Sequence, residues 1–146
     1  MALAVGLQFA LRLSIDEDDL RSQRMARLRD RLEGALRSTS PEVIINGGGA
    51  PRLPHTSNVA FPGLDRQALL MALDLAGVAC STGSACASGS SEPSLVLLAM
   101  GAPEEAVQAS LRFSLGAFTT AAEIDEAAHR ISQVVHASRR WVSISS

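Results

Sequence analysis

The stretch ASLRFSLGAFTTAAEID, residues 109–125, contains a strand pattern followed directly by the start of a helix. In its first half, leucine and phenylalanine alternate with serine and arginine, which is the two-residue period of a strand with one buried face. In its second half, Thr120 and Glu123 have the spacing of a capping box, in which two side chains bond the free backbone amides of a first helical turn. The stretch predicts a strand over 109–116 and a helix after it.

The same two kinds of pattern recur along the rest of the chain. Apolar residues repeat every three to five positions up to Leu36, after a capping-box pattern at residues 14–17. Strand patterns occupy residues 41–47, 57–63 and 78–81, and helix patterns occupy residues 65–77, 92–101 and 120 onward. This mixture, without a repeat, predicts an α+β two-layer sandwich whose helices pack on one face of a small, mostly antiparallel sheet. The helix over 65–77, apolar on most sides, is expected to be buried.

The composition narrows the class of protein. Its 146 residues, 47% of them hydrophobic, predict a single globular domain over residues 1–146. A formal net charge of -2 and an aromatic content of 3% argue against a nucleic-acid-binding or membrane-surface protein. All 13 basic residues are arginine. Because the chain has no lysine, no lysine side chain can form a Schiff base with a carbonyl compound.

The first residues and the cysteines indicate where the protein works. The opening MALAVGLQFAL, residues 1–11, is apolar, but it is too short to span a bilayer and lacks the basic start of a signal peptide. We interpret it as the start of a buried helix. Cys80 and Cys86 are too few for a disulfide framework and have no partner at zinc-ligand spacing, so no metal site is expected. These features predict a cytoplasmic protein in a reducing compartment.

Cys86 is the main candidate for a chemical role. It lies in STGSACASGSS, residues 81–91, where nearly every residue is small. A reactive thiol needs exposure and an electropositive surrounding, and a loop of serine, glycine and alanine supplies exposure and mobility. On composition alone, the alternative is a surface linker that happens to contain a cysteine. Cys80 ends an apolar strand pattern and is expected in the core.

Arg112 is the second candidate, because it falls on the polar face of the strand over 109–116. A guanidinium there could bind a carboxylate through two parallel hydrogen bonds. The pattern equally allows a half-buried arginine paired with an aspartate or glutamate of the same chain. His55, His129 and His136 have no catalytic neighbours in the sequence, and the last two are expected on the surface of the final helix.

Several ordered motifs resemble one enzyme family. G-S-A-C within the serine-rich loop, then E-P-S, A-M-G and R-F-S-L-G, and finally a threonine-capped helix, occur in this order over residues 83–125. Together with SNVAFPG at residues 57–63, they resemble the C-terminal part of a group I, NifS-like cysteine desulfurase, a branch of the fold-type I pyridoxal-phosphate enzymes. The resemblance covers essentially the whole chain and is weakest in residues 1–40, which look like the helix that leads out of the cofactor domain.

The resemblance implies a role for each candidate residue. Cys86 would be the catalytic thiol that takes sulfur from L-cysteine as a persulfide, leaving L-alanine, and passes it from a mobile loop to a sulfur-acceptor or scaffold protein for iron–sulfur cluster or thio-cofactor assembly. Arg112 would bind the carboxylate of the substrate. The resemblance also implies a homodimer and a pyridoxal phosphate cofactor in the parent enzyme.

The departures from the family are informative as well. The cofactor-binding lysine of the family, and the histidine and aspartate that contact the cofactor ring, belong to the large domain and have no counterpart here. The chain therefore resembles the small domain alone, with its leading helix, and we expect it to bind no cofactor and to be inactive by itself. Two rival interpretations remain: a non-enzymatic thiol or persulfide carrier or interaction module, and a folded remnant without function.

Overall fold

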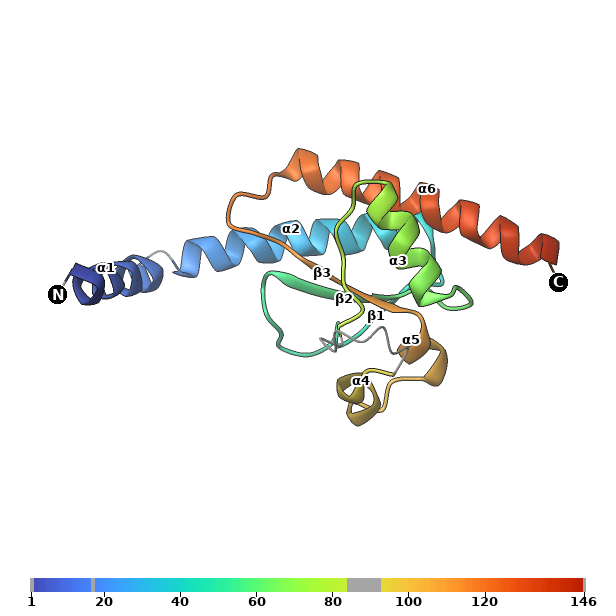
Figure 1. The fold of residues 1–146 in the computed structure, drawn as a ribbon, viewed down its shortest axis with the longest axis horizontal. Coiled ribbons are helices and arrows are strands. Elements are labelled where there is room, and N and C mark those ends of the chain that lie inside the picture. Colours follow the sequence, from blue (N-terminus) through green and yellow to red (C-terminus); the bar gives the residue numbers. More distant parts are fainter. Residues whose placement is uncertain (1, 17, 84–92, 146) are drawn as a thin grey trace.

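The computed structural model describes residues 2–16, 18–83 and 93–145, and these form helices around a small sheet (Figure 1). In chain order the elements are α1 (Ala2–Asp16), α2 (Asp18–Thr39), β1 (Ile44–Ile45), β2 (Thr56–Ala60), α3 (Arg66–Leu75), α4 (Leu95–Ala99), α5 (Glu104–Gln108), β3 (Ser110–Ser114) and α6 (Ala121–Ser145).

The sheet has the antiparallel order β1-β2-β3 within the described residues. Val59 of the central strand pairs with Ile45 on one side and Leu111 on the other. Because directly paired residues project from the same face of a sheet, their buried side chains meet. In β3, burial of Leu111 and Phe113 alternates with exposure of the residues that follow them. The strand predicted over 109–116 is confirmed, slightly shortened.

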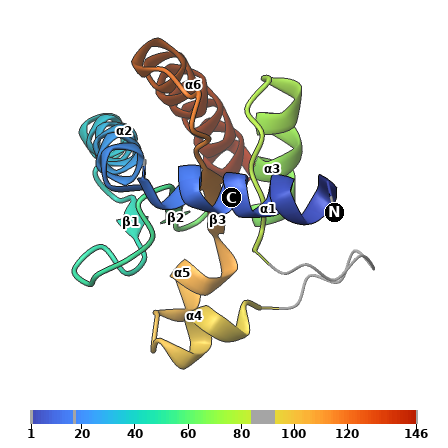
Figure 2. The same ribbon diagram turned by 90° about the vertical axis from the view of Figure 1, so that its left-hand side faces the viewer.

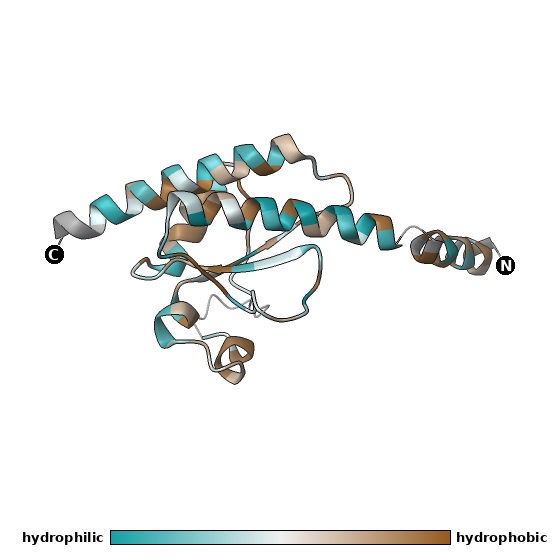
Figure 3. Ribbon diagram, turned by 180° about the vertical axis from the view of Figure 1, so that it is seen from behind, coloured by the Kyte–Doolittle hydropathy of each residue, from teal (hydrophilic) through white to brown (hydrophobic). Residues whose placement is uncertain are grey.

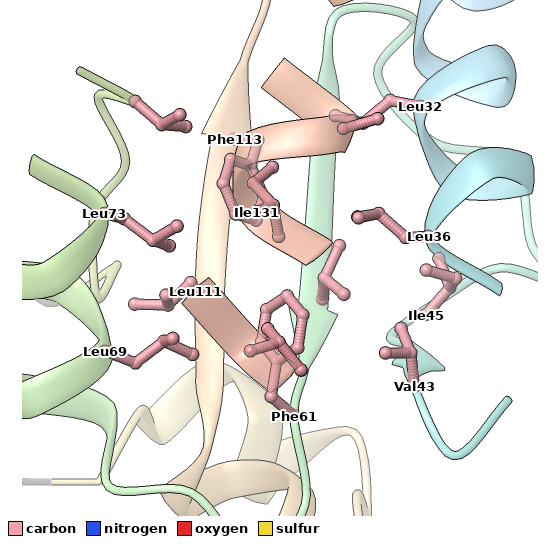
Figure 4. Close-up of a cluster of buried hydrophobic side chains, with 14 of the residues drawn as sticks. Leu32, Leu36, Val43, Ile45, Phe61, Leu69, Leu73, Leu111, Phe113 and Ile131 are labelled. Carbon is pink, nitrogen blue, oxygen red and sulfur yellow. The ribbon is translucent and has the colours of Figure 1, made fainter. Parts of the chain in front are cut away.

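Helices α2, α3 and α6 cover one face of this sheet, while α4 and α5 lie on its other side (Figures 1 and 2). In the close-up, side chains from α2, α3 and α6 point toward those of the strands and of the adjoining loops (Figure 4). Each fully buried Leu, Ile or Phe side chain stabilises the fold by about 1.5–3 kcal/mol. The α+β sandwich is therefore confirmed, and its core lies between the sheet and these three helices.

The predicted helix boundaries are confirmed at several ends. At α6, the Thr120 amide and hydroxyl both donate to Glu123 Oε2, and the Glu123 amide donates back to Thr120 Oγ1. Asp65 caps α3 by accepting from the Ala68 amide at 2.7 Å. Just after α3, Gly77 has a φ of +74°, a conformation that strongly favours glycine.

The structure corrects our expectation for the opening segment. Residues 2–16 form α1, and its large apolar side chains are exposed, between 45% for Leu13 and 91% for Leu3. Figure 3 shows α1 as a largely apolar helix standing away from the core. Residue 14 lies inside α1, and the next helix begins at Asp18, so the helix start predicted at residues 14–17 is wrong. The reason is geometric: α1 points outward from the start of α2, where the chain offers little to cover it. Among the described helices, none combines the length and the apolar character that a membrane span requires.

Other expectations were only partly right. Residues 78–81 were expected to form a strand, but the structure has a single bridge, between Ser81 and Arg112. The helix predicted over 65–77 is α3, and it is buried along one side only, with Leu75 exposed. The short helix α5 was not anticipated. The first two errors share a cause, because a short apolar segment does not reveal how many of its sides will be covered.

Candidate functional site

Arg112 lies in the middle of β3, with its side chain exposed on the face of the sheet opposite the core. Its backbone is held by Ser81: the Arg112 amide donates to Ser81 O at 2.6 Å, and the Ser81 amide donates to Arg112 O at 3.0 Å. Within the described part of the chain, no aspartate or glutamate forms an ion pair with Arg112. Among the described residues, Arg112 is therefore an exposed arginine without an internal acidic partner.

The Ser81–Arg112 bridge also fixes where the Cys86 segment begins. Ser81 is the first residue of STGSACASGSS, so the bridge attaches the start of that stretch to the strand that carries Arg112. Cys86 itself lies outside the described residues. Its predicted role and the predicted mobility of its loop therefore remain predictions.

Cys80 is close to Arg112 in the fold but is chemically unsuited to nucleophilic work. Its side chain is half-buried and packs against the core, as expected. Burial, with a smaller contribution from the negative charge of Asp74, raises the pKa of the Cys80 thiol to about 11. Since the thiolate is the reactive form, Cys80 is almost entirely protonated at neutral pH.

A row of polar residues crosses the sheet on the face of Arg112. Asn46, just after β1, pairs with Asn58 of β2 through the hydrogen bond from its amide to Asn58 O, at 2.9 Å. Asn58 in turn is the direct partner of Arg112, and Arg112 is the partner of Ser81. Directly opposed residues share one face, so these four side chains form a polar row, in the order Asn46, Asn58, Arg112 and Ser81. Sequence reasoning missed the two asparagines, although polar Asn58 within an apolar strand pattern was a usable signal.

A second polar cluster lies on the core face of the sheet. Glu33 of α2 is only 5% exposed, and it accepts from Arg52 Nη1 and Nη2 at 2.6 and 2.7 Å and from Ser57 Oγ at 2.7 Å. Burial raises the pKa of the Glu33 carboxyl, but these hydrogen bonds, with the positive charges of Arg52 and Arg29, outweigh it and hold the pKa below its ordinary value. All the carboxylate oxygens are partnered, so this cluster joins α2 to β2 and is not a site for a ligand.

The remaining candidates carry no site. His129 and His136 are exposed on α6 as expected, and His129 bonds Gln133. His55 is half-buried. Among the residues that the structure describes, no group of three or more histidine, cysteine or acidic side chains could hold a metal ion. A hollow of about 830 Å³ opens on the helix side of the sheet, but neither Arg112 nor Ser81 lines it.

Comparison with known proteins identifies the protein family to which this chain belongs. Residues 1–127 match the model of the aminotransferase class-V family. The chain therefore belongs to the aminotransferase class-V family.

The relatives are more specific. The chain is 41% identical over 135 residues to a cysteine desulfurase of Trichormus azollae, 39% over 141 residues to an IscS-like cysteine desulfurase of Mycobacterium tuberculosis, and 37% over 134 residues to the cysteine desulfurase NifS of Azotobacter vinelandii. These matches cover 92%, 96% and 92% of this chain but only 34%, 36% and 33% of the relatives. The chain thus spans about a third of the length of the relatives that it matches.

Solved structures agree with this assignment. The fold is similar to a NifS-like protein from Rickettsia africae, with a TM-score of 0.71 and 28% identity over 85% of this chain and 31% of that one. A second NifS-like protein matches with a TM-score of 0.70 and 25% identity, over 85% of this chain and 30% of the other. The resemblance to cysteine desulfurases inferred from the motifs is confirmed.

Proposed function

We propose that this chain is the C-terminal domain of a cysteine desulfurase, in which Cys86 takes sulfur from L-cysteine and Arg112 binds the substrate carboxylate. The observation that carries the proposal is the Ser81–Arg112 bridge. It ties the segment that bears the thiol to the strand that bears the carboxylate-binding arginine. A five-residue tether from Ser81 spans at most about 18 Å, which keeps both groups within reach of one small substrate.

Arg112 is suited to the binding step by its exposure and its fixed backbone. A guanidinium that has no carboxylate partner among the described residues can donate two parallel hydrogen bonds to a ligand carboxylate, and such charge-assisted pairs are stronger than neutral ones. Because both the amide and the carbonyl of Arg112 are bonded to Ser81, its Cα is held in place while the side chain turns toward the ligand. This arrangement orients the amino acid without committing the arginine to a structural ion pair.

Sulfur transfer would take place at Cys86. Its thiolate attacks the sulfur of L-cysteine, so an S–S bond forms while the Cβ–S bond of the substrate breaks. The electron pair of the broken bond and one proton end on Cβ, which gives L-alanine, and Cys86 is left as a persulfide. A sulfur-acceptor protein then takes the outer sulfur for iron–sulfur cluster or thio-cofactor assembly, with a thiol returning at Cys86.

Pyridoxal phosphate, which the family implies, does not fit the residues of this chain. The cofactor is anchored through a lysine amine, and all 13 basic residues here are arginine. We therefore place cofactor binding, and the activation of the Cβ–S bond, in the part of a full-length desulfurase that this chain does not span. In such an enzyme the domain would work within a homodimer.

A chimera tests the proposal. Residues 1–146 replace the matching third of the Trichormus azollae cysteine desulfurase, and sulfide and alanine are measured with L-cysteine and a reductant. We expect turnover that Cys86→Ala lowers at least about 100-fold, while the matched variant Cys80→Ala stays within about twofold because Cys80 packs beside the core and is protonated. Replacing Arg112 by glutamine should raise KM about 10- to 100-fold.

Two results with the chimera would overturn the proposal. One is a chimera that folds, shown by the visible absorbance of bound cofactor, but does not turn over. The other is Cys86→Ala activity equal to that of the parent chimera. The isolated chain, mixed with pyridoxal phosphate and L-cysteine, should release no sulfide and form no stable coloured complex. Turnover by the isolated chain that survives dialysis would show that the domain assignment is wrong.

A further inference from the structure

We propose that Asn58 is a second binding residue for the substrate carboxylate, held in position by Asn46. This inference rests on the carboxylate role proposed for Arg112 and extends it to a two-residue site. It starts from the register of the sheet, in which Asn58 and Arg112 are direct partners on adjacent strands, 54 positions apart in the sequence.

Asn58 and Arg112 form the kind of antiparallel pair in which the two side chains lie closest together. Hydrogen-bonded pairs in this ladder fall on residues of odd number, as shown by Leu115 N donating to His55 O and Phe61 N donating to Ala109 O. Asn58 and Arg112 are thus a non-hydrogen-bonded pair, in which Cα atoms are about 4.5 Å apart and side chains approach most closely. Both side chains lie on the face without the core, where Asn58 is half-buried and Arg112 is exposed.

A chain of hydrogen bonds decides which end of the Asn58 amide is available. Ser110 Oγ donates to the carbonyl of Ala106, which can only accept. Having used its single proton, Ser110 Oγ accepts from Asn46 Nδ2 at 2.8 Å, and Asn46 Nδ2 gives its other proton to Asn58 Oδ1 at 2.7 Å. The oxygen of Asn58 is therefore occupied by Asn46, whose Nδ2 also reaches Ser110 of β3.

The nitrogen of Asn58 is left as a donor. With its oxygen bonded to Asn46, the Nδ2 group of Asn58 is the remaining polar end of its amide, on the sheet face that also carries Arg112. Among the described residues, Nδ2 has no hydrogen-bond partner, and the Asn58 side chain is half-buried. An N–H donor in the residue paired with Arg112, whose guanidinium has no acidic partner in the described part of the chain, suits a carboxylate, whose two oxygens can accept from both.

In this arrangement Arg112 supplies the positive charge, and Asn58 fixes the orientation of the bound carboxylate. Arg112 alone is a long, exposed side chain that could bind a carboxylate in several positions. Asn58 is short, sits in the central strand and is fixed by Asn46, so its hydrogen bond defines where the carboxylate lies between β2 and β3. We assign the pair to the carboxylate of a small amino acid, with Asn46 as a positioning residue that acts through Asn58.

The test is a nuclear magnetic resonance titration of the ¹⁵N-labelled chain with L-alanine, which carries the carboxylate but no sulfur. The side-chain amide of Asn58 and the Nε–H of Arg112 should shift together with one dissociation constant. L-Alaninamide, which lacks the carboxylate, and sodium chloride at equal ionic strength serve as controls and should shift neither. Asn58→Leu should weaken L-alanine binding at Arg112 about 10- to 100-fold, and Asn46→Ala should weaken it less. The control Ser114→Ala, on the same face of β3, should leave binding unchanged.

The outcomes separate this inference from the proposed function. If Arg112 shifts with L-alanine while Asn58 does not, the role of Asn58 is overturned and that of Arg112 stands. If neither group shifts up to saturating L-alanine, the carboxylate site at Arg112 fails as well. Shifts of equal size with chloride would show that the two residues bind anions in general, and would contradict the carboxylate role of Asn58 and that of Arg112. Because the parent chain is itself the main sample, the result does not depend on any variant folding.

Discussion

Selective alkylation of the two cysteines would test whether Cys86 is the working thiol. Two variants, Cys80→Ser and Cys86→Ser, each retain one cysteine, and the rate of iodoacetamide labelling is measured for each at pH 7.5. We expect Cys86, the cysteine left in the Cys80→Ser variant, to react much faster than Cys80 in the Cys86→Ser variant. Its sequence neighbours are the small residues serine, alanine and glycine, whereas Cys80 is packed against the core.

The size of the difference follows from the pKa of Cys80, which burial and Asp74 raise to about 11. At pH 7.5 a thiol of that pKa is roughly 0.03% thiolate, against about 9% for an ordinary cysteine of pKa about 8.5. This ratio of roughly 300 is partly offset, because a more basic thiolate is intrinsically about tenfold more nucleophilic. Cys86 should therefore react at least about 20-fold faster, and restricted access to Cys80 widens the gap.

A pH series gives a second check on the same reasoning. Labelling of Cys80 should rise about tenfold for each pH unit up to about pH 11 as its thiolate forms. If Cys80 reacts as fast as Cys86 at pH 7.5, or levels off near pH 8.5, the argument from burial is refuted and the assignment of Cys86 loses its support.

Two further predictions concern stability and assembly. Arg52→Ala should lower the free energy of unfolding by about 3 kcal/mol at pH 7, because it leaves Glu33 as an unpaired buried charge. The pKa of Glu33 is lowered in the fold, so the stabilisation by its charge is complete at neutral pH and is lost as pH falls through the folded pKa. The difference in free energy of unfolding between the parent chain and Arg52→Ala, measured by urea titration, should therefore shrink in acid. An equal difference at pH 7 and pH 3.5 would contradict the ion pair. The chain should also self-associate through the exposed apolar side chains of α1, and the double substitution Leu7→Glu and Phe9→Glu should make it monomeric; light scattering that shows a strict monomer for the parent chain at high concentration would contradict this.

Much of the local structure could be predicted from the sequence. The alternation in β3, the capping box at Thr120 and the stop at Gly77 are all found in the structure. Each of these signals depends on residues within a few positions of one another, so the chain carries it before any tertiary contact forms. The family resemblance is local in the same sense, because its motifs are short and follow one another in order.

The tertiary structure decided burial and juxtaposition. The apolar α1 looked like a core helix, but whether a helix is covered depends on where its neighbours in space lie, and here α1 points away from them. Cys86 and Arg112 could be named from the sequence, whereas the place of Asn58 beside Arg112 could not. That contact joins positions 54 residues apart through the register of two strands. Register is set by which apolar side chains pack together across the sheet, and only the folded chain specifies that packing.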